Sequence, residues 1–399
     1  MAPTSLLEEF PPVSTEAWNA AIARDLKDPD YESKLTWHIG EGLAVKPWYR
    51  AENLAGLACV DTAPGEFPYR RGARGTGDWR IREEIDATDA KAANGAACAA
   101  VAGGAEEIAF SRILVESALE LELLLKNLAE IPVHFECADK RLIRLLAERV
   151  STGASTAGIS TGYDAQTSLD FAAETICSAP AGFVPFTIHS GRFEQAEASA
   201  PEETGLALAA GVDFLAAMEQ RGVAADRAAA AIEFSFAVGP NYFIEIAKLR
   251  AFRMVWARAV ESSGGTREAA RARIAARTSR GNQSTNDSHM NALRATTEAM
   301  AAVLGGADAV VVPLFDACNK TPDEASRRLA RNTQLILKHE ACLGRVADAA
   351  GGSYYLETLT DLVAQEAWKI MQEIETRGGF RSAHRTEPAL AGHREGRTA

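Results

Sequence analysis

The feature that most constrains the fold is a regular alternation of short apolar runs with longer amphipathic runs over most of the chain. The short runs are rich in β-branched and aromatic residues, and the clearest helical stretch, NYFIEIAKLRAFRMVWARAVE, begins at Asn241. Strands that alternate with helices form a parallel sheet with the helices packed outside it. We expect strands at residues 106–111, 131–137, 156–160, 183–189, 231–238, 274–278, 308–314 and 345–348.

Eight strands, each followed by a helix, are typical of a closed parallel barrel. The sequence therefore predicts an α/β protein, a TIM-type (β/α)8 barrel with an N-terminal extension and C-terminal helices. A doubly wound open sheet is the alternative, because the strands at residues 156–160 and 345–348 carry the weakest pattern.

The chain divides into three parts by pattern. Residues 1–64 mix aromatic residues, glycines and prolines without a steady period, apart from a helix that Ser14 can cap. We interpret them as an N-terminal arm that packs on the barrel or on a partner subunit, and a self-contained small domain is the alternative. Residues 65–380 form the expected barrel, and residues 381–399 form a polar, flexible tail.

Charge and cysteine usage exclude several classes of function. The net charge of −12 leaves no excess of Lys or Arg to neutralise phosphates, so nonspecific nucleic-acid binding is not expected. The six cysteines are scattered without a C-x-x-C pair, so we expect free thiols and no metal site. The N-terminus has no signal-peptide pattern, and no apolar run approaches the ~20 residues of a membrane span. We therefore expect a cytoplasmic protein that has no membrane partner.

Several long runs carry a resemblance to a known family. They are TEAMAAVLGG from Thr297, RLARNTQLIL from Arg328, GGSYYLETLT from Gly351 and GPNYFIEIAKLRAFRMVWA from Gly239. These runs resemble the adenosylcobalamin-dependent acyl-CoA mutases, the methylmalonyl-CoA mutase family. The opening from Glu8 onward is most similar to the small (beta, non-catalytic) subunit, and only its substrate-barrel part is represented.

The resemblance implies a barrel that threads acyl-CoA down its axis and is capped by a separate cobalamin domain. That domain ligates cobalt through the His of a D-x-H-x-x-G loop. The only H-x-x-G run here starts at His393, and Ala391 stands where the Asp belongs. We therefore expect no cobalamin-binding domain. The resemblance implies adenosylcobalamin for the assembly, ligated by another chain.

The catalytic branch of the family carries a G-Y-H-M-Q-E stretch whose His lies over the substrate thioester. The matching run here is HSGRFEQ from His189, so Arg192 or Phe193 takes that position. The resemblance places the catalytic tyrosine near Arg74 within the run RRGARGTGDW, and that run contains no tyrosine. The T-I-Q-N-D segment has no counterpart in residues 150–175. We therefore expect an active site that lacks the catalytic residues of the family, with His189 and Arg192 as the remaining catalytic candidates.

Other polar residues have both a functional and a structural interpretation. Asn291 and Glu298 lie a heptad apart on one expected helix and could contact a nucleoside or a partner. The loop arginines Arg70, Arg71 and Arg74 could bind the phosphates of CoA, or could simply be solvated. Asn241 is a further candidate for substrate binding. It could equally begin a helix, since it follows Gly-Pro.

Two functions remain open at this stage. The first is a non-catalytic small subunit that forms a heterodimer with a large, cobalamin-carrying catalytic subunit. The alternative is an active barrel that rearranges a different acyl-CoA with a separate cobalamin-binding subunit.

Overall fold

The computed structural model describes residues 12–27, 30, 34–39, 43–86, 88–136, 140–151, 157–162, 168–180, 182–191, 198–319 and 323–386. The chain forms two compact units, residues 1–50 and residues 51–399. The expected arm extended to residue 64, so residues 51–64 belong to the second unit.

The described residues of the first unit include one helix and one pair of strands. Helix α1 (Thr15–Leu26) begins where expected, because the Ser14 hydroxyl accepts a hydrogen bond from the Ala17 amide at 3.2 Å. Strands β1 (Trp37–Ile39) and β2 (Leu43–Val45) pair antiparallel. None of the residues of α1 is buried, and Trp18 is 45% exposed although its ring lies 6.4 Å from that of Trp48.

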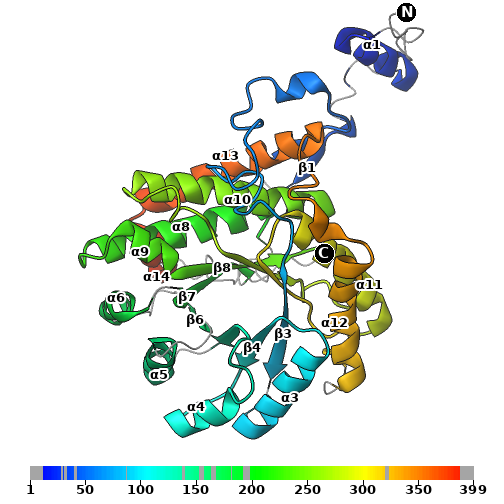
Figure 1. Cartoon of the computed structure of the whole chain (residues 1–399). Coiled ribbons are helices and arrows are strands. Elements are labelled where there is room, and N and C mark those ends of the chain that lie inside the picture. Colours follow the sequence, from blue (N-terminus) through cyan, green and yellow to red (C-terminus); the bar gives the residue numbers. More distant parts are fainter. Residues whose placement is uncertain are drawn as a thin grey trace, which may run out of the picture. The chain divides into compact units, whose positions relative to one another are not determined.

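The second unit confirms the predicted barrel. Among the described residues, eight parallel strands close on themselves in the order β10-β3-β4-β5-β6-β7-β8-β9 (Figure 1). They are β3 (Arg80–Asp86), β4 (Glu107–Ser111), β5 (Val133–Glu136), β6 (Ala157–Gly162), β7 (Val184–His189), β8 (Ile232–Val238), β9 (Ile274–Thr278) and β10 (Ala309–Val311).

One predicted strand is wrong, and another strand was missed. Residues 345–348 form no strand: the 3-10 helix η2 (Leu343–Arg345) ends there, and Asp348 has a φ of 49°, which is incompatible with extended backbone. The missing strand is β3, in the run RIREEID. Its inward positions carry charged side chains, so it lacks the continuous apolar run that usually marks a buried parallel strand.

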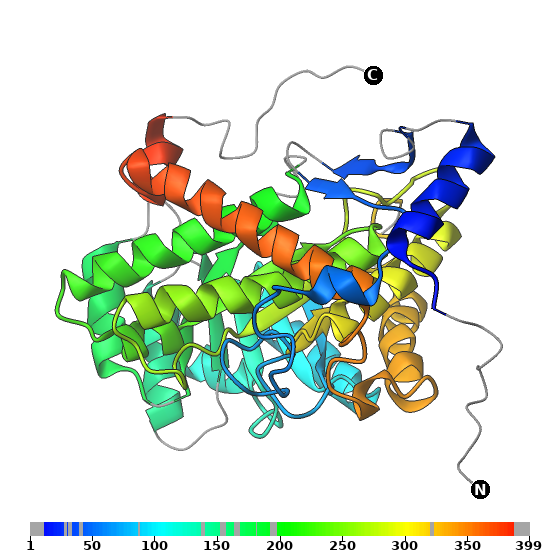
Figure 2. The same ribbon diagram turned by 90° about the horizontal axis from the view of Figure 1, so that it is seen from above.

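The helices surround the barrel (Figures 1 and 2). They are η1 (Ala51–Leu54), α3 (Ala90–Ala102), α4 (Ala118–Leu124), α5 (Lys140–Ser151), α6 (Leu169–Ser178), α8 (Ala200–Glu219), α9 (Ala225–Ala230), α10 (Tyr242–Ser262), α11 (Ser288–Leu304), α12 (Glu324–His339), α13 (Tyr354–Thr376) and α14 (Phe380–Thr386). Helix α13 crosses the outside of α8 and α10 (Figure 2). The start of the expected tail, residues 381–386, is therefore helical. In the described part of the chain, no helix is long and apolar enough to span a membrane.

The apolar core lies between the strands and the helices. On β8, Phe234 and Phe236 point outward, and both rings lie within 5 Å of Phe252 on α10. Since successive side chains alternate across a strand, Glu233 and Ser235 point into the barrel. The aromatic side chains of the sheet thus lie in the outer layer, and polar side chains point toward the barrel axis.

Candidate functional site on the barrel axis

A buried ion network crosses the barrel axis. Arg82 on β3 reaches across to β8, where its two terminal nitrogens each lie 2.9 Å from an oxygen of Glu233. Its Nη2 also lies 2.8 Å from Glu107 on β4. Paired, parallel contacts between a guanidinium and a carboxylate are among the strongest hydrogen bonds in proteins. This inner layer therefore ties three strands together through the middle of the barrel.

Burial and neighbouring charges shift the pKa values of the ionisable groups in this layer. Burial alone would raise the pKa of Glu233, but the charge and hydrogen bonds of Arg82 outweigh it and keep that pKa at about 2. Burial raises the pKa of Glu107, and the nearby charge of Glu233 adds to the effect. Burial, helped by Arg82, lowers the pKa of His134 on β5 to about 3. His134 is therefore neutral near pH 7, so its 3.8 Å approach to Glu233 is not an ion pair.

A second layer of ion pairs lies closer to the carboxyl ends of the strands. Arg277 on β9 bonds to Glu84 on β3 and lies 3.0 Å from Glu136 on β5, which is on the opposite side of the barrel. Arg280, just beyond β9, adds a contact of 3.3 Å to Glu84. Because functional residues of such barrels collect at this end, the second layer occupies the place where a substrate would enter.

Between these layers little space remains. The cavity lined by Arg82, His134, His189, Ser235 and Arg277, among others, has a volume of about 10 Å³. That volume admits about one water molecule, whereas small-molecule sites are roughly 300–1,000 Å³. This cavity is therefore too small for an acyl-CoA chain or a corrin ring.

The two catalytic candidates have different outcomes. His189 ends β7 and lines this cavity, so its expected place at the barrel mouth is correct, while its role stays a prediction. Arg192 lies outside the described residues. The residues that fill the axis, Arg82, Glu107, His134, Glu233 and Arg277, were not singled out from sequence. An alternation of charged and apolar residues, as in RIREEID, is the signal that could have revealed them.

Stability should depend on the buried imidazole between pH 7 and pH 5. His134 in the folded chain has a pKa of about 3, below the ordinary value of about 6.5. As the pH falls through 6.5, the unfolded chain binds a proton that the folded chain does not, so folding is weakened. As the pH falls from 7 to 5, we expect the free energy of unfolding of His134→Gln to decrease by about 2 kcal/mol less than that of the native chain.

Urea unfolding of both proteins at several pH values between 7 and 5 measures this difference. Parallel plots of unfolding free energy against pH would show that the imidazole is protonated in the folded chain as well, contrary to the expectation.

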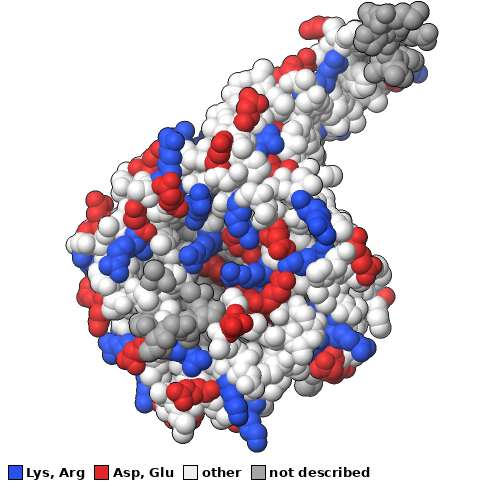
Figure 3. All heavy atoms as spheres, in the orientation of Figure 1, with Lys and Arg blue, Asp and Glu red and all other residues white. Residues whose placement is uncertain are grey.

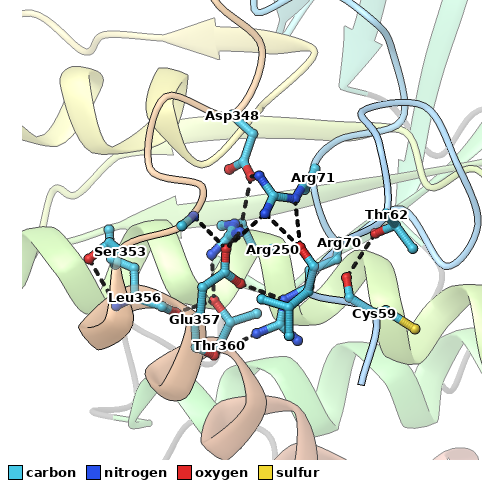
Figure 4. Close-up of polar contacts among 12 residues, drawn as sticks. Cys59, Thr62, Arg70, Arg71, Arg250, Asp348, Ser353, Leu356, Glu357 and Thr360 are labelled. Carbon is cyan, nitrogen blue, oxygen red and sulfur yellow. Dashed lines mark hydrogen bonds and ion pairs between the residues drawn. The ribbon is translucent and has the colours of Figure 1, made fainter. Parts of the chain in front are cut away.

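The three loop arginines differ in how far they are buried. Arg70 is fully buried, and it donates to the Glu357 side chain on α13 at 2.7 Å and to the Glu357 carbonyl at 2.6 Å. Figure 4 shows that Arg71 and Arg250 converge on the same carboxylate. The expectation that this loop is a solvated charge cluster is wrong for Arg70, because its charge is paired inside the protein.

The remaining arginines of the loop are partly accessible. Arg71 donates to the Val60 carbonyl at 2.6 Å, and Arg74 lies 3.2 Å from Asp308. Both line a cavity of about 20 Å³ together with Arg253, whose guanidinium bonds to backbone carbonyls. Phosphate binding by this loop is not tested by these contacts and stays a prediction.

The cofactor candidates on α11 hold a loop in place. The Asn291 side chain accepts from the Ser284 amide at 2.9 Å and donates to the Phe315 carbonyl at 3.0 Å. Glu298 accepts from the Ser279 amide at 3.2 Å. The two residues share one face of the helix, as expected, and both are buried. Asn241 precedes the first residue of α10 without a side-chain cap.

Charges on the outer surface are mixed. Figure 3 shows basic and acidic side chains interspersed on one face of the molecule, with no continuous basic area among the residues drawn in colour. This distribution agrees with the net charge of −12 and gives no track for a nucleic-acid backbone on that face.

Comparisons with known proteins agree with the barrel and its motifs. The family described as methylmalonyl-CoA mutase matches residues 163–387, more than half of the chain. The methylmalonyl-CoA mutase small subunit of Porphyromonas gingivalis is 35% identical over 96% of this chain and 66% of its own length. The small subunit of Streptomyces virginiae is 34% identical over 96% of this chain and 67% of its own length. The large subunit of Streptomyces virginiae is 28% identical over 94% of this chain and 58% of its own length.

The chain thus spans about two thirds of the length of the small subunits that it matches. A long family match, relatives above 30% identity and a closed eight-stranded barrel all agree. The chain belongs to the methylmalonyl-CoA mutase family.

Proposed function

We propose that this chain is the non-catalytic barrel of a small mutase subunit in the cytoplasm, which pairs with a large catalytic subunit. The large subunit carries adenosylcobalamin and interconverts methylmalonyl-CoA and succinyl-CoA. This chain ligates no cobalt, and its role is to complete and stabilise the assembly. The names of its relatives, small and large mutase subunits, support such a pairing.

The observation that carries the proposal is the filled barrel axis. A radical rearrangement needs a dry tube that accepts the substrate and excludes water. Here Arg82 joins β3 to the non-adjacent strand β8, and Arg277 joins β9 to the opposite strand β5. A cavity of about 10 Å³ lies between the two arginines. To open a tube, the buried ion pairs of Arg82 and the partly exposed ion pairs of Arg277 would have to break. Breaking one buried pair typically costs about 3–5 kcal/mol.

The first unit is the part of the chain that we assign to pairing. Its helix α1 has no buried residue, and Trp18 and Trp37 are 45% and 49% exposed. Large aromatic side chains are enriched at protein interfaces, where each buries about 150–250 Å². Deletion of this unit should therefore weaken association with the large subunit more than it destabilises the barrel.

The alternative function is an active barrel that uses a separate cobalamin-binding subunit and a different acyl-CoA. One observation favours it: His189 lines the axial cavity at the end of a strand, where catalytic groups of such barrels lie.

Omission of single components separates the two functions. Methylmalonyl-CoA turnover is measured with the purified pair, with each subunit alone, and with this chain plus a separate cobalamin-binding subunit, always with adenosylcobalamin. We expect turnover only when the large subunit is present. Turnover by this chain without the large subunit, lost in His189→Gln, would establish the alternative instead.

A further inference from the structure

A cavity of about 20 Å³ lies where four separate segments of the chain meet. Arg71 and Arg74 line it from the loop before β3, and Arg253 lines it from α10. The end of α11 and the segment after η2, which contains Asp348, complete the wall. Three guanidinium groups and one carboxylate therefore surround a space that admits about one water molecule.

Arg253 is buried without an acidic partner. Its guanidinium donates to the Tyr69 carbonyl and to two carbonyls at the end of α11. Among the described residues, no carboxylate lies within ion-pair distance of it, and one N–H on each terminal nitrogen has no acceptor. Burial lowers the pKa of Arg253 to about 10, although the charges of Asp308 and Asp348 oppose this shift. The charge of Arg253 is therefore only partly compensated.

The nearby carboxylates are bonded to other arginines. Asp348 and Glu357 accept hydrogen bonds from Arg250 at 3.0 and 2.9 Å. Glu357 also accepts one from Arg70 at 2.7 Å. Arg71 points toward the same two carboxylates (Figure 4), but its nitrogens lie 3.8 and 3.7 Å from them, which is too far for hydrogen bonds. Arg71 thus also lines the cavity without a hydrogen-bonded carboxylate.

Positive charge exceeds negative charge around this cavity. Five guanidinium groups and three carboxylates meet there, namely Arg70, Arg71, Arg74, Arg250 and Arg253 with Asp308, Asp348 and Glu357. The C-terminal end of α11 offsets about half an elementary charge. Asp78 and Arg345, which adjoin the lining residues, are exposed, and Asp78 pairs with Lys338. A buried charge that is not compensated is costly, so the cavity favours an anion.

We propose that this cavity binds one small monovalent anion, such as chloride, between Arg71 and Arg253. One negative charge offsets most of the excess, and a halide ion is close to a water molecule in size. A phosphate group, with four oxygens, is too large for a space of about 20 Å³. The bound ion holds the loop before β3 against α10. This site is distinct from phosphate binding by the loop arginines, and it does not depend on pairing with a large subunit.

Chloride should stabilise the purified full chain. Urea unfolding is followed at pH 7 in mixtures of sodium chloride and sodium gluconate at constant ionic strength, because gluconate is too large for the cavity. Above the Kd of the site, each tenfold rise in chloride should lower the equilibrium constant for unfolding about tenfold. This dependence should vanish in Arg253→Met. It should also weaken in Arg71→Gln, which changes a partly exposed side chain.

A matched control lies on the same helix. Arg258 is 57% exposed and pairs with Glu261 at the surface, so Arg258→Met makes the same chemical change away from the cavity. This control should keep the chloride dependence of the native chain, which separates binding at the site from general effects of salt.

Crystals of the native chain grown in sodium bromide locate the ion by anomalous diffraction. We expect a bromide peak inside the cavity, beside Arg71 and Arg253. Crystals without a peak there would overturn the proposal, as would a chloride dependence that is equal in the native chain and Arg253→Met. Inorganic phosphate that displaces bromide from the cavity would assign the site to a larger anion, and the proposal would fail in that case too.

Discussion

Replacement of Arg82 by methionine should lower the free energy of unfolding by about 3–5 kcal/mol, the loss expected when one partner of a buried ion network is removed. Arg82 is the one partner that Glu107 and Glu233 share across the axis. Without it, two carboxylates face each other in a medium of low dielectric constant. The free energy from urea unfolding, compared with that of the native chain at pH 7, measures the loss.

A volume-matched variant separates charge from packing in this experiment. Arg82→Met combined with Glu107→Leu and Glu233→Leu removes the whole network, and such apolar replacements are often neutral or stabilising. We expect the triple variant to recover most of the loss. In Arg82→Met alone, the penalty should shrink as the pH falls, because protonation removes the unpaired charge. A triple variant as unstable as the single one would mean that the site depends on arginine for its shape.

Glu357→Gln should lower the free energy of unfolding by about 3 kcal/mol, because it too removes one partner of a buried ion network. The Glu357 carboxylate accepts hydrogen bonds from Arg70 at 2.7 Å and from Arg250 at 2.9 Å (Figure 4). It also accepts one from the Gly352 amide at 2.9 Å. A neutral amide leaves Arg70 buried without a counter-charge and turns an NH₂ group toward other donors. Chemical denaturation of the variant beside the native chain measures the effect.

The same helix offers a control for this second change. Glu366 forms a surface ion pair with Lys369 on α13 at 2.9 Å. Pairs of this kind contribute about 0.3–0.5 kcal/mol, so Glu366→Gln should be nearly neutral. Equal effects from Glu357→Gln and Glu366→Gln would show that the buried cluster contributes no more than a surface contact.

The fold was predictable wherever a strand carries its apolar residues in one run. The run FVPFTIH became β7, and AIEFSFAV became β8, because their outward positions hold phenylalanines that pack on helices. Strand β3 was missed because Arg82 and Glu84 interrupt that pattern. Their partners lie on distant strands, so local sequence carries no sign that these charges are buried and paired.

The candidate site was predictable only in part, for a related reason. His189 was placed correctly because the ends of strands can be identified locally. The burial of Arg70 was not foreseen, since its loop reads as solvated and its partner Glu357 is 287 positions away. A charge that is neutralised by a distant residue looks the same in sequence as one that faces water.

That long separation has a consequence for biosynthesis. Ribosomes add about 5–20 residues per second, so Arg70 is made roughly 15–60 s before Glu357. Strand β3 emerges early as well, yet one of its two neighbours, β10, comes more than two hundred residues later. The growing sheet must therefore keep an open edge until β10 is made, and Arg70 has no carboxylate partner until α13 is made. We expect this chain to be a client of ribosome-associated chaperones until synthesis is nearly complete.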